Sequence, residues 1–199
     1  MKKELDYFLV GNAYGGYQEW FSDYMMRVGG CAAVTACDCC IYFARYKNMP
    51  FLYPYNSENI TKRDYISFSM AMKPYLRPRW TGIDNLDLYT DGFGSYLSEH
   101  NANISMETFD GNNKVNEAEK AVTQQIDNGF PVPCLILNHN NSAFKDYVWH
   151  WFLLTGYERF ADRLMVKAVT YGSWRWVPLD GLWDTGRQRK GGLILFRET

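Results

Sequence analysis

The feature that most restricts the fold of this sequence is a run of mostly small and apolar residues from Cys31 to Arg45. Gly29 and Gly30 stand directly before the run, and neither glycine nor proline interrupts it. A run of this length behind two helix-breaking residues predicts a helix that begins at Cys31. One stripe at three- or four-residue spacing is expected to face the core: Ala33, Cys37, Cys40 and Ala44.

The second half of the chain is rich in Val, Leu, Ile and aromatic residues, with turn residues between the apolar segments. We expect a strand at Ile104–Phe109, a helix at Val115–Asn128, and then four strands at Pro131–Leu137, Trp149–Tyr157, Leu164–Tyr171 and Gly192–Phe196. Helices that come first and an antiparallel sheet that comes last predict an α+β fold. A length of 199 residues fits a single domain, 1–199, with its own hydrophobic core.

Two regions give weaker signals. A short strand is expected at Tyr7–Val10, before a glycine-containing turn at Gly11–Gly16. Four prolines punctuate residues 46–112, where helical pieces are expected around 61–73 and 91–100.

The charge of the chain excludes several kinds of partner. With 21 basic and 22 acidic side chains, it has no net field to attract nucleic acid or an anionic membrane. No segment approaches the ~20 apolar residues of a membrane span, and the first residues lack the apolar stretch of an export signal. The five cysteines, three of them crowded into positions 37–40, do not have the spacing of a disulfide framework. We therefore expect a reducing compartment, the cytoplasm.

Cys31 is the first candidate for chemistry. A thiol in the first turn of a helix meets the positive end of the helix dipole and unpaired backbone amides, and both favour the thiolate. The amide of Cys31 is also expected to face an oxyanion developing on a substrate, and Gly29 and Gly30 would let a substrate approach closely. The alternative is that Cys31 is only a small buried residue at a helix start.

A thiol hydrolase also needs a base that takes and returns the proton. The chain has three histidines. His100 lies in an expected helix end and His139 lies among asparagines, so both are interpreted as solvated. His150 stands at the start of an otherwise apolar and aromatic strand, Trp149–Tyr157, and is the better candidate.

The order of these motifs resembles the papain-like cysteine peptidases. The resemblance consists of a Gly-Gly-Cys helix start followed, more than a hundred residues later, by His150 and the Gly156-Tyr157 pair that leads into another strand. The helix and strand over Ala121–Leu137 that precede His150 make the chain most similar to the C39-like bacterial group. The resemblance covers the Cys31 helix and residues 115–173, and it implies a papain-like fold in which that helix packs on the sheet.

The resemblance also implies roles for individual residues. Cys31 matches the nucleophile and His150 the general base and acid, acting on a peptide or small amide through a thioester. Thr170 stands on the following strand where the family has an Asn or Asp that orients the imidazole, and a Thr hydroxyl lacks the charge of a carboxylate. Gln18 is the nearest glutamine before Cys31 and is the candidate side-chain donor to the oxyanion, the alternative being an exposed loop amide.

Other interpretations stay open. The same Cys–His pair could serve an acyltransferase or a transglutaminase-like enzyme, and a non-catalytic binding module could have kept the fold. No cofactor or metal is expected: three thiols within four helical residues, Cys37–Cys40, cannot converge on one zinc ion, and nucleotide-binding glycine motifs are absent. Trp149, Trp151 and Trp174 are expected either to wall the cleft or to pack in the core.

Overall fold

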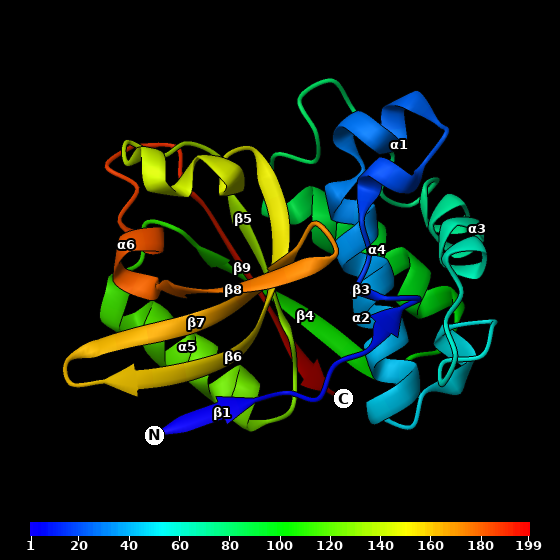
Figure 1. Ribbon diagram of the computed structural model, residues 1–199, viewed down its shortest axis with the longest axis horizontal. Helices are drawn as coiled ribbons and strands as arrows, with labels where there is room; N and C mark the ends of the chain where they lie inside the picture. Colours follow the sequence, from blue (N-terminus) through cyan, green and yellow to red (C-terminus); the bar gives the residue numbers. More distant parts are fainter.

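The protein has an α+β fold, seen in a computed structural model that describes residues 1–199. Figure 1 shows helices α1 to α4 together on the right of a strongly twisted sheet, with α5 and α6 on its left. The helices are α1 (Tyr24–Gly29), α2 (Cys31–Tyr46), α3 (Lys62–Met72), α4 (Leu86–Glu99), α5 (Val115–Asp127) and α6 (Leu179–Trp183), with short 3₁₀ turns at Gln18–Trp20, Pro50–Leu52 and Ser142–Tyr147.

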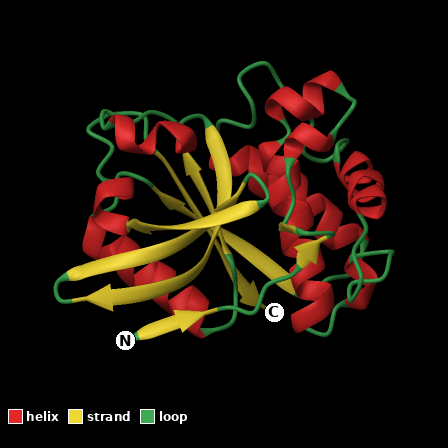
Figure 2. Ribbon diagram, in the orientation of Figure 1, coloured by secondary structure: helices red, strands yellow, loops and turns green.

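All pairs in the seven-stranded sheet are antiparallel. Its strands run in the order β4-β9-β5-β6-β7-β8, and β1 pairs with the second half of β6 (Figure 2). The strands are β1 (Lys2–Glu4), β4 (Ile104–Asp110), β5 (Val132–Ile136), β6 (His150–Phe160), β7 (Arg163–Thr170), β8 (Ser173–Pro178) and β9 (Gly191–Glu198), and a separate ribbon joins β2 (Leu9–Val10) to β3 (Ala13–Tyr14).

Helix α2 begins at Cys31, as the glycine pair predicts, but it is buried on most of its surface rather than along one stripe. Between Cys31 and Phe43 only Val34 is not buried. The reason is that α2 lies between strand β6 and helix α3, with the 3₁₀ turn at Pro50–Leu52 also against it. A helix made of small residues can be enclosed in this way because neighbouring backbones can approach it closely.

Most of the expected elements are present, and the differences have local causes. The strand expected at Tyr7–Val10 is reduced to Leu9–Val10. Helix α4 begins at Leu86 rather than near 91, because the side chain of Asn85 accepts hydrogen bonds from the first backbone amides of the helix. Strands β1 and β8 and helices α1 and α6 were not expected; all four have six residues or fewer.

A buried glutamine forms hydrogen bonds with the part of β9 that extends beyond its pairing with β5. Gln125 of α5 donates from Nε2 to the carbonyl of Phe196 at 3.0 Å and accepts from its amide at 2.8 Å. These two bonds satisfy both backbone groups of Phe196, which would otherwise be unpaired in the interior.

Replacing Gln125 with Met keeps most of the side-chain volume and removes both hydrogen bonds. We expect a loss of about 2 to 4 kcal/mol in the free energy of unfolding, because a buried donor and a buried acceptor lose their partners. Urea unfolding of the variant measures this loss. Gln124→Met, at an exposed position of the same helix, is the control and should change stability little; equal effects at both positions would contradict the assignment.

Candidate functional site

Cys31, His150, Gln18 and Thr170 come together where the N-terminus of α2 meets the first residues of β6. Cys31, His150 and Gln18 line two cavities. We call the first the Asp38 cavity; it is narrow, about 10 Å³, and Thr170 and Asp38 also line it. We call the second the Trp80 cavity; it has a volume of about 320 Å³.

His150 begins strand β6 and is held on two sides. Its Nε2 lies 2.6 Å from the hydroxyl oxygen of Thr170 on β7, and its ring stacks on that of Tyr171 with centroids 4.6 Å apart and planes 8° from parallel. Because Nε2 is occupied by Thr170, Nδ1 is the ring nitrogen left for another partner. Burial lowers the pKa of His150 to about 4, so the imidazole is neutral at pH 7.

Burial also determines the protonation state of Cys31, a residue that is 5% exposed. It raises the pKa of the Cys31 thiol, while the backbone N–H groups of Trp151, Ala32 and Cys31 itself partly oppose this rise. The helix N-terminus was expected to favour the thiolate. Its amides do lower the pKa of the Cys31 thiol, but desolvation outweighs them in the free protein. The Cys31 thiol and the His150 imidazole are therefore both uncharged at neutral pH.

The backbone is unusual at two residues that flank His150 and Thr170. Trp149 and Tyr171 have φ values of 54° and 55°, a left-handed conformation that bulky residues rarely adopt. Tyr171 and Gly172 (φ 67°) form the two-residue turn between β7 and β8. The chain therefore reverses directly after Thr170, one residue before the expected end of this strand at Tyr171. Such local strain is common at functional sites.

A buried carboxylate ties the segment before Gln18 to helix α2. Asp38 accepts hydrogen bonds from the hydroxyls of Tyr65 at 2.7 Å and Tyr7 at 2.8 Å, and from the amide of Gly16 at 3.2 Å. Burial raises the pKa of Asp38 to about 6, against the lowering effect of these donors. A side chain at residue 16 would overlap the Tyr65 hydroxyl, so only glycine permits this approach.

Gln18 follows this anchored segment, in the 3₁₀ turn that spans Gln18–Trp20. Its Nε2 donates to the carbonyl of Arg27 at 3.0 Å, which fixes the amide at the end of α1. A second Nε2 hydrogen is not used by this bond. Gln18 is partly buried and lines both cavities with Cys31, while its amide hydrogen bond to Arg27 lies at an exposed position.

The two glycines before Cys31 have a packing role. A Cβ at Gly29 would lie 2.9 Å from the carbonyl oxygen of Arg79, and a Cβ at Gly30 would overlap the carbonyl of Met26. Gly29 lines the Trp80 cavity and so also borders the space a ligand would enter. The close contact that these glycines permit is therefore with the protein's own backbone.

The other histidines lie outside both cavities. The expectation that they are simply solvated is wrong, because each is half-buried and hydrogen-bonded to the backbone. His100 Nδ1 is 2.8 Å from the carbonyl of Tyr96, and His139 Nε2 is 2.9 Å from the carbonyl of Gly181. Of the three tryptophans considered, Trp149 lines the Trp80 cavity and Trp151 the Asp38 cavity, whereas Trp174 lines neither.

No group of three or more His, Cys, Asp or Glu side chains is arranged to hold a metal ion, and all five cysteines are buried free thiols. None of the helices combines the length and apolar character needed to cross a membrane. Comparisons with family models, curated proteins and solved structures found no match to this chain.

Sequence reasoning missed Asp38 and Tyr171. Asp38 had a visible signal, since an acidic residue inside an otherwise small and apolar helix must be either exposed or specifically bonded. Tyr171 had a weaker one, the Gly172 that follows it, because a residue before glycine is a common place for a two-residue turn. Neither signal identifies the partner, which comes from another element.

The pH dependence of stability tests the burial of His150. An imidazole whose pKa falls from 6.5 to about 4 on folding stabilises the protein fully above pH 6.5, and this stability is lost as the pH falls toward 4. The loss amounts to about 3 kcal/mol. Wild type should therefore lose about that much more free energy of unfolding than His150→Gln between pH 7 and pH 4. Asp38 titrates over an overlapping range with the opposite sign, but it is present in both proteins; parallel pH profiles would refute the assignment.

Tyr65→Phe tests the Asp38 anchor. The variant removes one donor from an ionised carboxylate, so we expect a loss of about 2 kcal/mol at pH 7.5. At pH 5, below the pKa of Asp38 of about 6, the carboxyl is protonated and the loss should fall to about 1 kcal/mol. Tyr75→Phe is the control because the Tyr75 hydroxyl bonds to Glu99 at the surface. A loss that does not change with pH would mean that Tyr65 does not bond the ionised form.

Proposed function

We propose that this chain is a cysteine peptidase or related thiol amide hydrolase of the papain-like type, with Cys31 as nucleophile and His150 as base. The observation that supports this most is that two residues more than a hundred positions apart line the same two cavities. The papain-like fold and the C39-like resemblance belong to this proposal, since they rest on the Cys31 and His150 motifs.

In the proposed reaction the neutral His150 takes the proton from the Cys31 thiol as sulfur attacks the amide carbonyl carbon. The carbon–nitrogen bond then breaks, the imidazolium gives its proton to the leaving amine, and a thioester remains on Cys31. Water attacks the thioester with His150 again as base, which releases the acid and restores the thiol. The backbone amide of Cys31 and the side chain of Gln18 would stabilise the oxyanion.

Thr170 has the orienting role in this proposal. Its hydroxyl oxygen is placed to accept the Nε2 proton of His150, which leaves Nδ1 unprotonated and able to act as the base. A hydroxyl gives less stabilisation to the imidazolium than a carboxylate does. This difference agrees with the low pKa of His150, because burial acts there without an opposing negative charge.

Two alternatives have specific observations in their favour. The raised pKa of the Cys31 thiol favours a binding module that does not use the thiol. An acyltransferase or transglutaminase-like enzyme would use the same thioester with an amine in place of water, and the open Trp80 cavity has room for such an acceptor. The five free thiols are consistent with a reducing compartment, and we propose the cytoplasm.

Alkylation of Cys31 by iodoacetamide at pH 7, followed by peptide mass mapping, separates these functions. We expect Cys31 to react and the other four thiols, which have no exposed surface, to stay unmodified. Because exposure alone could explain that selectivity, the decisive comparison is His150→Gln, which should slow the reaction about 100-fold if His150 is the base. His139→Gln is the control and should react like wild type.

Equal rates in wild type and His150→Gln would favour the binding module. If the rates differ, product analysis of an ester substrate with and without an added primary amine distinguishes hydrolysis from acyl transfer. An amide product formed only with the amine would indicate the transferase.

A further inference from the structure

The Trp80 cavity opens directly beside Cys31 and His150 and is much larger than the space around the thiol itself. Its volume of about 320 Å³ lies at the lower end of the range of about 300 to 1,000 Å³ that ligand pockets occupy. This space can hold one large side chain of a substrate together with the adjacent backbone. It is too small for a folded partner.

The walls of the cavity are uncharged and combine apolar side chains with the polar Gln18 and Thr81. Apart from His150, no acidic or basic side chain lines it, and its outer walls are formed by Val28, Trp80 and Trp149. These three side chains are 48%, 77% and 44% exposed, and Tyr24, also exposed, lies edge-on to Trp80 at 6.2 Å. Exposed aromatic groups gathered around a cavity mark a binding surface more often than single exposed residues do.

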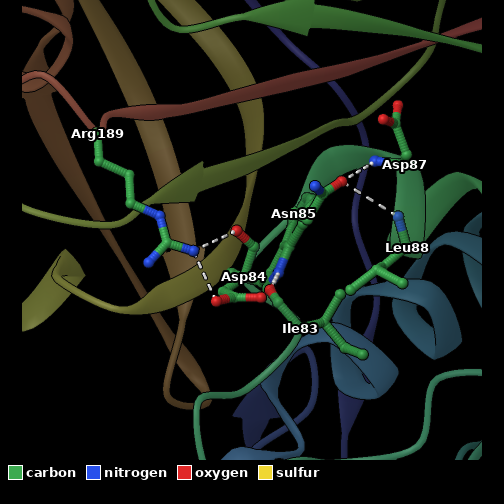
Figure 3. Close-up of polar contacts among 7 residues, drawn as sticks. Ile83, Asp84, Asn85, Asp87, Leu88 and Arg189 are labelled. Carbon is green, nitrogen blue, oxygen red and sulfur yellow. Dashed lines mark hydrogen bonds and ion pairs between the residues drawn. The ribbon is translucent and has the colours of Figure 1, made fainter.

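The loop that presents Trp80 is fastened at its far end. The indole Nε1 of Trp151 donates to the carbonyl of Ile83 at 2.6 Å in the interior. Figure 3 shows the guanidinium of Arg189 reaching Asp84, at 2.6 Å from its carboxylate, beside the start of α4 that Asn85 caps. These bonds hold the loop against β6 and against the residues just before β9.

Arg189 also contacts the opposite wall. Its guanidinium lies 5.2 Å from the centroid of the Trp149 ring, within the range of a cation–π interaction. One side chain therefore bonds the loop of Trp80 through Asp84 and supports Trp149. At the other end of the loop, the carbonyl of Arg79 packs on Gly29, next to the nucleophile helix. Both aromatic walls are thus positioned relative to Cys31 by contacts within the protein.

We propose that the Trp80 cavity is the specificity subsite of this enzyme and binds an aromatic or large aliphatic side chain next to the amide that Cys31 attacks. This inference rests on the proposed function. Substrates with a carboxylate or ammonium group at the same position are disfavoured, because no opposite charge in the lining compensates the loss of water.

Three chloroacetamides with the same reactive group test the subsite: chloroacetamide, its N-(2-phenylethyl) derivative, and its N-(3-carboxypropyl) derivative. Intact-mass measurement at pH 8 gives the rate of Cys31 alkylation by each. We expect the phenylethyl compound to react about tenfold faster than chloroacetamide, from burial of the ring, and the carboxylate to react no faster than chloroacetamide. Trp80→Ala should lower the ratio of the phenylethyl rate to the chloroacetamide rate toward 1.

Phe160→Ala is the control, because Phe160 is equally aromatic and 59% exposed but lies at the end of β6 and lines neither cavity. Equal rates for phenylethyl and unsubstituted compounds, or a Trp80→Ala effect that is the same for all three, would overturn the subsite. The rate ratio is readable whether or not His150 assists. A phenylethyl preference in a protein whose alkylation does not depend on His150 would support the subsite and reject the proposed hydrolase.

Discussion

The packing of the first turn of α2 against the first residues of β6 is the constraint on which the site depends. It places Cys31, His150 and Trp151 around the same cavity. The contact is possible because α2 consists mainly of alanine, cysteine and other small residues, so that the strand can lie close to the helix backbone. Larger side chains at these positions would separate thiol and imidazole.

The same packing has an electrostatic consequence. Enclosing Cys31, His150 and Asp38 in one region removes water from all three, and each pKa moves toward the neutral form: that of the thiol and of the carboxyl rises, and that of the imidazole falls. The site of the free protein therefore holds neutral groups rather than a stable ion pair. Asp38 stays bonded by tyrosine hydroxyls and a backbone amide, which limits the cost of its burial.

Two segments with little regular structure complete the site. Residues before Gln18 bridge α2, through Asp38, and the β7–β8 turn, through the bond from the Gly172 amide to the Gly16 carbonyl. The loop that ends at Asn85 presents Trp80 and is held by Trp151 and Arg189. Both segments lie in regions whose composition gives weak signals, since such loops are positioned by individual long-range hydrogen bonds rather than by a periodic pattern.

The sequence alone determined that a helix begins at Cys31 and that strands dominate the second half of the chain, but not the start of α4 or the presence of β1, β8, α1 and α6. The features that it determined depend on interactions between residues a few positions apart: the two glycines before Cys31, the apolar run after it, and the strand that starts at His150. Local sequence patterns were therefore sufficient to predict the α+β class. Only the tertiary structure decided that α2 is enclosed by its neighbours. It also decided that β7 ends at Thr170, whose hydroxyl lies near His150, and that burial outweighs the helix dipole in setting the pKa of Cys31. These properties depend on strand register and on solvent exclusion by distant segments, and no local pattern encodes either.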